Sequence, residues 1–150
     1  MPIQECMKGW IRQYGIKTVI NAPCGNNGDA EMFRQLGVTE VLPVDKIGGA
    51  NPSIIVGDLQ EWKPVKPYDA VYQNGSFNPA YENVDDGRLV MENMATWPVK
   101  YILIYDMSLY FDWTDTLSKA GWKLLADGPS TDSVGAGKVR CEIWTRANEA

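Results

Sequence analysis

The chain has 150 residues, enough for a substantial core, and we expect 1–150 to form a single domain. Its formal net charge of -5 disfavours sequence-independent binding to nucleic acid, which depends on Lys and Arg neutralising phosphates. Three cysteines without a CxxC pair, and no histidine, disfavour disulfide scaffolds, zinc sites and histidine-based triads. Without an apolar run of about 20 residues or the layout of a signal peptide, we expect a cytoplasmic protein that does not enter the membrane.

The first third of the chain predicts a helix, a strand and a second helix. Apolar residues recur at helical spacing within 1–15, and Gly15 stands where such a helix needs a left-handed cap. Residues 16–22, IKTVINA, have the continuously apolar character of a strand covered on both faces. Asp29 can then cap a helix that Gly37 closes. The apolar faces of the two helices are Ile3, Met7, Trp10, Ile11 and Tyr14, and then Met32, Phe33 and Leu36.

Strands dominate the middle of the chain. We expect a second strand within 38–46 that ends on Asp45, a third at 53–58, and a fourth in YDAVYQNGSF, residues 68–77. Only DKIGGANP, residues 45–52, separates the second strand from the third, whereas a parallel crossover usually takes about a dozen residues. Either a loop replaces the crossover helix, or one of the two strands is misplaced.

The remainder alternates helices and strands and ends in a hairpin. A helix begins at Asp85 and Asp86 and is stopped by Pro98, the strand YILIYD follows at 101–106, and Asp112 starts a helix that ends at Gly121. Two closing strands at 122–128 and 138–146 flank the turn-rich loop 129–137. This order predicts an α/β sheet over 16–147, parallel for most of its width, with one antiparallel strand at the end. The apolar positions of the two helices are Leu89, Val90, Met94 and Trp97, and then Trp113, Leu117 and Ala120.

The best candidate for a ligand site is TVINAPCGNNGD, residues 18–29. A buried strand that runs into a turn of Gly and Asn brings backbone N–H groups and a helix N-terminus to a ligand. Asn26, Asn27 and Gly28 accept positive φ at little cost, so the backbone can curl tightly beneath a small molecule. An ordinary strand-turn-helix corner is the alternative reading.

With the elements in this order, residues 16–147 resemble the class I S-adenosylmethionine-dependent methyltransferases. VINAPCGNNGD, at 19–29, is similar to the family's first motif, which lies under the methionine end of the cofactor. The resemblance implies a three-layer, Rossmann-like α/β sandwich whose mostly parallel, seven-stranded sheet carries an antiparallel C-terminal hairpin strand, without a substrate-domain insertion. It also implies S-adenosyl-L-methionine as cofactor, and two positions depart from the motif: Asn21 stands where an acid is usual and Asn27 where Gly is usual. The cofactor residues that it implies here are Asn21, Ala22, Pro23, Gly25, Asn27 and Gly28.

Further cofactor contacts are implied at the ends of the next two strands. Asp45 is similar to the family acid that binds both ribose hydroxyls, and Lys46 is placed beside it; one carboxylate can accept hydrogen bonds from two vicinal hydroxyls. Asp58 and Leu59 are similar to residues that meet the adenine, with Trp62 as a wall of that pocket. A solvated turn aspartate and a common Gly-Asp strand exit are the respective alternatives.

The fourth strand resembles the segment FDLIIGNPPY of enzymes that methylate amino groups. Asn74 then takes the place of the Asn that accepts from the target NH2 and also borders the cofactor, and Phe77 takes the place of the aromatic residue that stacks on the substrate. Both prolines of that segment are absent here. NPAY, at 78–81, is closer in letters but four residues out of register, and it is the alternative motif.

Two more aspartates have expected roles. Asp106 reaches the same carboxyl edge of the sheet and could act as a general base for a hydroxyl or amine; a cap for the next helix is the alternative. Asp69 enters its strand from the opposite edge, where we expect a structural role.

The resemblance implies methyl transfer to an unidentified acceptor, for example an amino group. The runner-up is an S-adenosylmethionine-binding protein that cleaves the cofactor or serves as a non-catalytic scaffold. A nicotinamide Rossmann domain is disfavoured because GNNGDA, at 25–30, does not supply G-x-G-x-x-G. With no substrate module in view, we expect an open substrate face that a partner subunit or a second copy covers, and a protein or small molecule as acceptor rather than nucleic acid.

Overall fold

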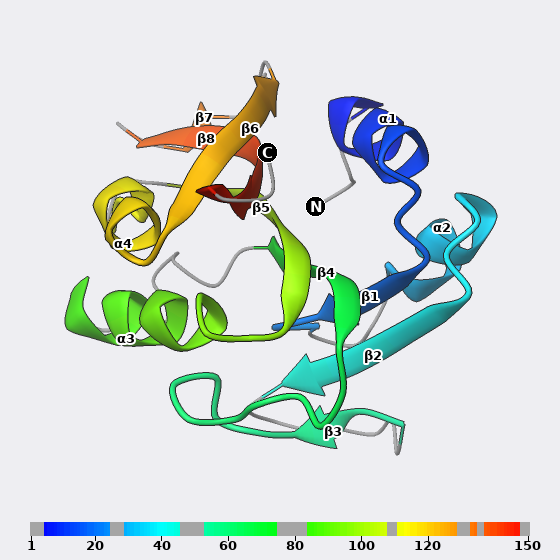
Figure 1. Ribbon diagram of the computed structural model, residues 1–150, viewed down its shortest axis with the longest axis horizontal. Helices are drawn as coiled ribbons and strands as arrows, with labels where there is room; N and C mark the ends of the chain where they lie inside the picture. The colour runs from blue at the N-terminus through cyan, green and yellow to red at the C-terminus, as the bar shows by residue number, and fades with distance from the viewer. Residues whose placement is uncertain are drawn as a thin grey trace.

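The structure, a computed structural model, describes residues 5–24, 29–45, 53–74, 84–107, 111–128, 133–134 and 137–147. It confirms the expected three-layer α/β sandwich, in which a central sheet lies between two pairs of helices (Figure 1). One pair is α1 (Glu5–Gln13) and α2 (Ala30–Gln35), and the other is α3 (Val84–Met94) and α4 (Thr114–Lys119). Among the described residues, no helix combines the length and the hydropathy needed to cross a bilayer.

The sheet is mostly parallel. Its strands are β1 (Thr18–Asn21), β2 (Glu40–Asp45), β3 (Ile55–Val56), β4 (Tyr68–Asn74), β5 (Val99–Met107), β6 (Trp122–Gly128) and β8 (Gly137–Arg146), in the order β3-β2-β1-β4-β5-β8-β6. Strand β8 runs antiparallel between β5 and β6, which confirms the single reversed strand of the hairpin. The expected loop 129–137 is wrong in one detail, because it contains the short strand β7 (Ser133–Val134), which pairs with β8.

The short connection between β2 and β3 does not signal a misplaced strand. The two strands pair in parallel, with Val44 opposite Ile55 and Asp45 opposite Val56. The third strand is nevertheless only two residues long, whereas 53–58 was expected. Ile55 is 36% exposed and Val56 is 64% exposed, because β3 is an edge strand and no helix covers it among the described residues.

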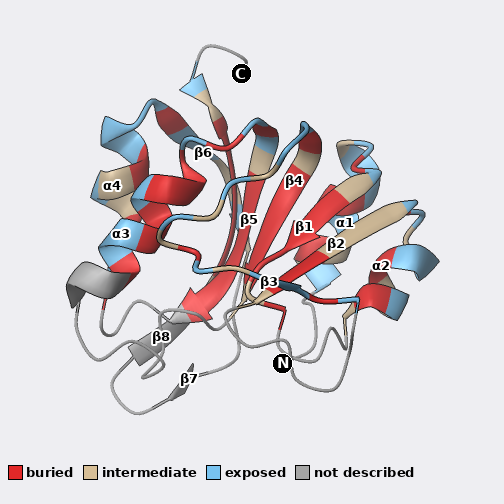
Figure 2. Ribbon diagram, turned by 90° about the horizontal axis from the view of Figure 1, so that it is seen from below, coloured by how far each residue is buried: buried red, intermediate tan, exposed pale blue. Residues whose placement is uncertain are grey.

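Each face of the sheet has its own hydrophobic cluster. The cluster under α3 and α4 includes Trp97, Trp113, Trp122 and Trp144, whereas Trp10 belongs to the cluster under α1 and α2. These five tryptophans are buried and Trp62 is half-buried, so the expectation that most of them pack in the core is confirmed. Figure 2 shows how thoroughly the central strands are enclosed compared with the β3 edge.

Most helix faces and caps follow the expected pattern. Gly15 and Gly37 have φ of 62° and 93°, the left-handed conformation in which glycine costs least. Leu89 was expected on the apolar face of α3, but it is 40% exposed. The buried stripe of this helix instead runs through Val90, Met91 and Met94, and Leu89 lies to one side of it. Ile3 lies outside the described residues.

Asp69 has the structural role that was expected at the amino edge of the sheet. Its Oδ2 accepts hydrogen bonds from the backbone N–H groups of Lys17 at 2.8 Å and Thr18 at 3.2 Å. In return, the Asp69 N–H donates to Thr18 Oγ1 at 2.8 Å. These bonds fix β1 against β4, so that Asn21 lies opposite Tyr72 where the two strands approach their carboxyl ends.

Candidate functional site

Four polar residues of adjacent strands reach the carboxyl edge of the sheet. Asp45 ends β2, Asn21 ends β1, Asn74 ends β4, and Asp106 is the next-to-last residue of β5. Because these strands are neighbours and run parallel, their carboxyl ends share one edge. Ligands of open α/β sheets bind at this edge. Five of the expected site residues lie outside the described residues, namely Gly25, Asn27, Gly28, Lys46 and Phe77.

The two described catalytic candidates point to opposite faces of the sheet. Tyr72 belongs to the cluster under α1 and α2, and Asn74, two residues further along β4, faces the same side. Ile104 belongs to the cluster under α3 and α4, and Asp106 shares its side of β5. The edge therefore has two polar corners, one near α2 and one near α4.

In the α2 corner, the carboxyl of Asp29 lies near the side chain of Asn74, which acts on its pKa. Asp29 occupies the N-cap position of α2, yet its side chain makes no capping bond, so the expected cap is wrong. The physical reason is its helical backbone conformation, with φ -82° and ψ -8°, whereas a capping residue normally adopts extended angles. Burial raises the pKa of Asp29, and the side chain of Asn74 opposes that rise.

Tyr72 lies next to this corner. Its ring packs edge-on against Phe33 of α2, with centroids 5.2 Å apart. Its hydroxyl is buried and has no hydrogen-bond partner among the described residues. Burial, with the charge of Asp29 adding to it, raises the pKa of this hydroxyl.

Backbone hydrogen bonds join the turn after β1 to both neighbouring strands. Ala22 N–H donates to the Tyr72 carbonyl at 3.1 Å, and Cys24 N–H donates to the Val44 carbonyl at 3.0 Å. Burial and the charge of Asp45 raise the pKa of the Cys24 thiol to about 11. The half-buried Asp45 carboxylate is therefore close enough to this turn to act on Cys24 electrostatically. Pro23 lies between the two hydrogen-bonded residues Ala22 and Cys24.

The residues expected near an adenine form a compact turn after β3. Asp58 is exposed, and its Oδ1 accepts the Gln60 N–H at 3.0 Å, as in an Asx-turn. Leu59 is buried in the core. The Trp62 ring covers Gly57, where a Cβ would come within 2.7 Å of it, and also packs edge-on against Trp97 with centroids 5.2 Å apart. The adenine contacts of Asp58, Leu59 and Trp62 stay a prediction.

In the second corner, Asp106 is paired with a residue that sequence reasoning missed. Gln73 Nε2 donates to Asp106 Oδ2 at 2.5 Å, and both side chains are buried. The alternative reading of Asp106 as a helix cap is wrong, because Trp113 is the N-cap residue of α4. A polar residue just before the end of an apolar strand was the sequence signal for Gln73.

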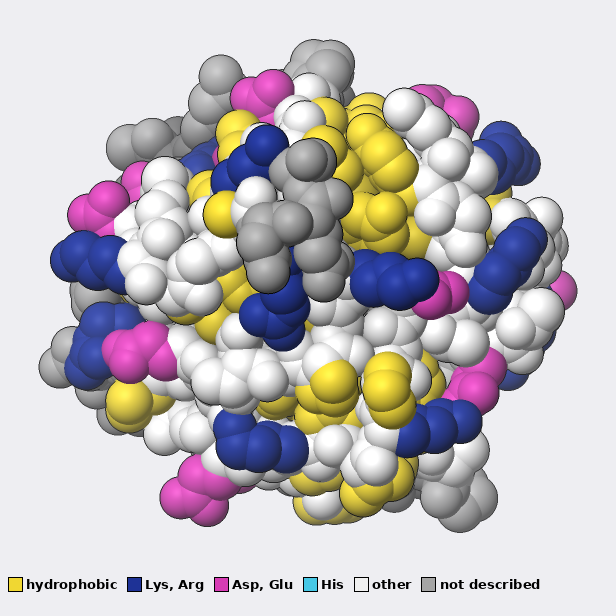
Figure 3. Space-filling model, viewed as in Figure 1, with side chains coloured by type: hydrophobic (Ala, Val, Ile, Leu, Met, Phe, Trp, Pro, Cys, Tyr) yellow, Lys and Arg dark blue, Asp and Glu magenta, His cyan; other side chains and the backbone are white. Residues whose placement is uncertain are grey.

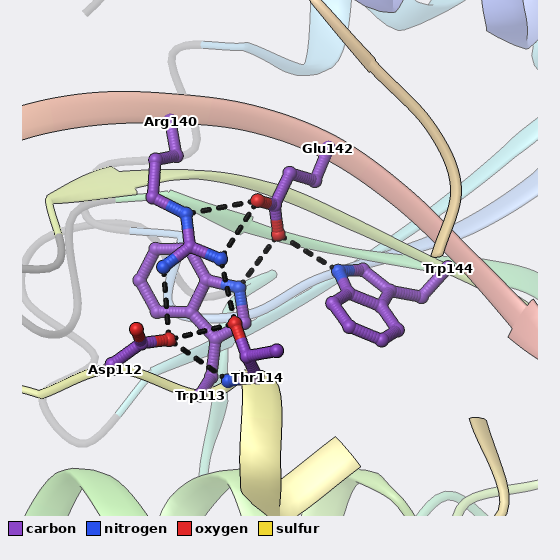
Figure 4. Close-up of polar contacts among 6 residues, drawn as sticks. All are labelled: Asp112, Trp113, Thr114, Arg140, Glu142 and Trp144. Atoms are coloured by element: carbon purple, nitrogen blue, oxygen red, sulfur yellow. Dashed lines mark hydrogen bonds and ion pairs between the residues drawn. The ribbon is translucent and has the colours of Figure 1, made fainter. Parts of the chain in front are cut away.

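Next to that pair, a hydrogen-bond network around the buried Glu142 attaches the start of α4 to β8 (Figure 4). Glu142 Oε1 accepts from the indole N–H groups of Trp113 at 2.8 Å and Trp144 at 2.9 Å. Its Oε2 accepts from Arg140 Nε at 2.8 Å, and Arg140 also donates to Asp112 Oδ1 at 2.9 Å. Arg140 lies opposite Asp106 in the β5–β8 pairing, so the network borders the site. The alternation of Arg140, Glu142 and Trp144 along one strand was its sequence signal.

Other kinds of site find no support in the described part of the chain. No group of three His, Cys, Asp or Glu side chains is placed there to hold a metal ion. On the face shown in Figure 3, the described basic side chains are interspersed with acidic ones instead of forming a single stripe.

Comparisons with known proteins identify the fold. No family model matches the sequence, and no curated protein matches it. Solved structures do match. A TehB-like S-adenosylmethionine-dependent methyltransferase from Corynebacterium glutamicum has a TM-score of 0.68 at 15% identity, over 93% of this chain and 86% of that one. Magnesium protoporphyrin IX methyltransferase from Synechocystis, solved with S-adenosylmethionine bound, has a TM-score of 0.71 at 14% identity, over 95% of this chain and 77% of that one.

A third match acts on a different substrate. The 1,6-didemethyltoxoflavin-N1-methyltransferase from Burkholderia thailandensis, with S-adenosylhomocysteine bound, has a TM-score of 0.65 at 13% identity, over 91% of this chain and 73% of that one. This chain has the fold of the class I S-adenosylmethionine-dependent methyltransferases, as its sequence motifs predicted. At these identities the likeness concerns the fold, and the acceptor is a separate question.

Proposed function

We propose that the protein binds S-adenosylmethionine at the carboxyl edge of its sheet and transfers the methyl group to an acceptor, with an amino group as the favoured target. The observation that carries this proposal is the row Asp45, Asn21, Asn74 and Asp106 on four adjacent strands of a methyltransferase-type sheet. Carboxylates and amides in such a row suit a ligand with a cationic sulfonium, an ammonium and two ribose hydroxyls.

The described residues fit the parts of this cofactor. Asp45, at the end of β2, would accept hydrogen bonds from the two ribose hydroxyls. Ala22 and Pro23, in the turn after β1, would lie under the methionine part, with Gly25, Asn27, Gly28 and Lys46 continuing the site. Asp58 and Leu59 would meet the adenine.

Asp29 supplies the acid that the first motif lacks. Asn21 stands where an acid is usual, and its amide cannot balance the charge of the cofactor's ammonium. The α2 corner holds the partly buried Asp29 carboxylate, which Asn74 orients. A carboxylate at this point would form a charge-assisted bond with the ammonium, so one acid would replace the other from a neighbouring element.

The same contact with Asp29 would orient the Asn74 amide toward an acceptor. S-adenosylmethionine supplies an electrophilic methyl group on its sulfonium. An ionised Asp29 can only accept hydrogen bonds, so the Asn74 amide would turn its NH2 toward it. The Asn74 carbonyl oxygen is then left to accept from a target NH2, while Phe77 would stack on the acceptor. Asp106, held by Gln73 on the other face of the sheet, would serve as the base for an acceptor that reaches the α4 corner.

Calorimetric titration with S-adenosylmethionine and S-adenosylhomocysteine tests binding, and mass spectrometry of the products tests transfer. The proposal expects both ligands to bind at one site and a methyl group to appear on an added amine, protein or small-molecule acceptor. Failure of both ligands to bind would overturn it.

The second candidate is a cofactor-binding protein that cleaves S-adenosylmethionine or serves as a scaffold. It is favoured by the engagement of the Asn74 side chain with Asp29, and by the absence of any helix between β2 and β4 in the described residues that could form a substrate module. Methylthioadenosine or adenosine without a methylated acceptor would identify it. In either case we propose a cytoplasmic protein whose open substrate face is covered by a partner subunit or a second copy.

A further inference from the structure

Two thiols from opposite ends of the chain meet where α1 packs on the sheet. Cys6 Sγ, in the first turn of α1, lies 3.0 Å from Cys141 Sγ on β8, 135 positions away in sequence. A disulfide bond is about 2.05 Å long, so the two sulfurs are about 1 Å from bonding distance. Their elements are held together by the packing of Met7, Trp10 and Ile11 in the cluster that also contains Cys141.

The surroundings of the pair leave room for the two sulfurs. Gly128 of β6 lies opposite Cys141 in the sheet. A Cβ built on Gly128 would overlap Cys6 Sγ and would come within 2.9 Å of Cys6 Cβ. Glycine at this position therefore allows the Cys6 side chain to lie flat against the strand and reach Cys141.

The two thiols differ in access to solvent. Cys6 is half-buried, whereas Cys141 is 1% exposed. Burial, together with the contact to Cys6, raises the pKa of the Cys141 thiol. Cys6 is therefore the thiol that a reagent in solution reaches first. Cys141 is the buried thiol that can then react with the modified Cys6. The third cysteine, Cys24, lies at the carboxyl edge beside Val44.

We propose that Cys6 and Cys141 are a reversible redox site, which a low-molecular-weight disulfide such as glutathione disulfide oxidises to an intramolecular disulfide. The Cys6 thiolate attacks glutathione disulfide, forms a mixed disulfide and releases one glutathione. The Cys141 thiolate then attacks the Cys6 sulfur and releases the second glutathione. The two thiols lose two electrons and two protons, and one glutathione disulfide becomes two glutathiones.

The bond would tie the first helix to the last strand. A crosslink between residues so far apart in sequence restricts the unfolded chain strongly, so the oxidised form should unfold at a higher temperature. It would also fix α1 near the carboxyl edge, since Cys141 pairs with Tyr105, the residue before Asp106. The inference rests on this contact and is independent of the proposed methyl transfer.

The test equilibrates the full-length protein with glutathione and glutathione disulfide, followed by thiol counting and a non-reducing peptide map. We expect free thiols to fall from three to one, the mass of the monomer to fall by two hydrogens, and the map to join Cys6 to Cys141. The midpoint of thermal unfolding should rise by several degrees and return to its former value with dithiothreitol. Cys24→Ser should keep this behaviour, and Cys6→Ser should lose it.

Four results would overturn the inference: three free thiols after oxidation, a bond that includes Cys24, a bond between two chains, or a lasting glutathione adduct on Cys6. The peptide map on the unmodified sequence decides among them even if a variant fails to fold. Oxidation of the urea-unfolded chain is the reference, because without the fold the shorter loop between Cys6 and Cys24 should close more readily than the loop between Cys6 and Cys141.

Discussion

The side chain of Asn74, the last residue of β4, lies near the carboxyl of Asp29, the residue before α2, and lowers its pKa against the rise that burial causes. This contact joins two elements at the carboxyl edge and replaces the helix cap that the sequence predicted. It places a partly buried carboxyl near the end of β4, the strand that pairs with β1, and β1 ends on Asn21, where the first motif usually has an acid.

Asp29→Asn should weaken S-adenosylmethionine binding by about 10-fold or more, the lower end of the about 1.5–3 kcal/mol of a charged hydrogen bond. Binding of methylthioadenosine, which lacks the amino acid part, should be almost unchanged. Calorimetry with both ligands measures the difference. Glu31→Gln is the matched control, since Glu31 is an exposed acid in the first turn of the same helix. An equal loss for both ligands would contradict the assignment of Asp29 to the ammonium.

The raised pKa of Asp29 makes the stability of the ligand-free protein depend on pH. A carboxyl whose pKa is higher in the folded state contributes stability below its ordinary pKa, and this contribution is lost as the pH rises through the folded-state value. The Asp29→Asn variant has no carboxyl that must ionise at this position. Its unfolding temperature should therefore exceed that of the natural sequence at neutral pH, and the difference between the two temperatures should shrink toward about pH 4. A gap that is constant with pH in thermal melts would contradict this account.

Asp45→Ala should weaken binding of S-adenosylmethionine and S-adenosylhomocysteine alike, by about 1.5–3 kcal/mol, because both ligands carry the same ribose. Asp115→Ala is a suitable control, since Asp115 is an exposed acid in the first turn of α4. Unchanged affinity in a calorimetric titration would remove Asp45 from the site.

Asn74→Ala should lower the rate of methyl transfer more than it lowers cofactor affinity, because the amide carbonyl is assigned to the acceptor. Turnover under saturating cofactor, together with a separate titration, measures the two effects. Asn78→Ala is the comparison, since NPAY at 78–81 is the competing motif. A rate that falls only in the Asn78 variant would transfer the role to that motif.

Glu142→Ala should be strongly destabilising, by about 3–5 kcal/mol, because it leaves a half-buried guanidinium with one carboxylate fewer and two buried indole N–H groups without their acceptor. Denaturant unfolding measures the loss. Glu92→Ala removes an exposed acid that pairs with Arg88 on the surface of α3, and it should cost less than about 1 kcal/mol. Equal effects of the two changes would show that the network of Figure 4 contributes no more to the free energy of unfolding than a surface ion pair does.

The helices, the strands and the mostly parallel sheet could be predicted because they rest on local patterns. YILIYD, at 101–106, is apolar enough to be a central strand, and Gly15 and Gly37 mark the ends of helices by their left-handed conformation. Asp69 was assigned a structural role because its place at the amino edge follows from strand direction alone. Such inferences need only the period of a strand and the chirality of the chain.

Side-chain pairings could not be predicted in the same way. The partners of Gln73, Arg140 and Glu142 lie on other elements, and a contact between Cys6 and Cys141 across 135 positions leaves no local trace. Leu89 was misassigned because the apolar residues of α3 fit more than one stripe. Asp29 was mistaken for a cap because capping depends on backbone angles that its neighbours determine.

The most direct measurement is a calorimetric titration of S-adenosylmethionine into the purified protein at neutral pH, repeated with the Asp29→Asn variant. The account predicts saturable binding to one site, displacement by S-adenosylhomocysteine, and a clear loss of affinity in the variant. No heat of binding and no shift in unfolding temperature at millimolar ligand would contradict it.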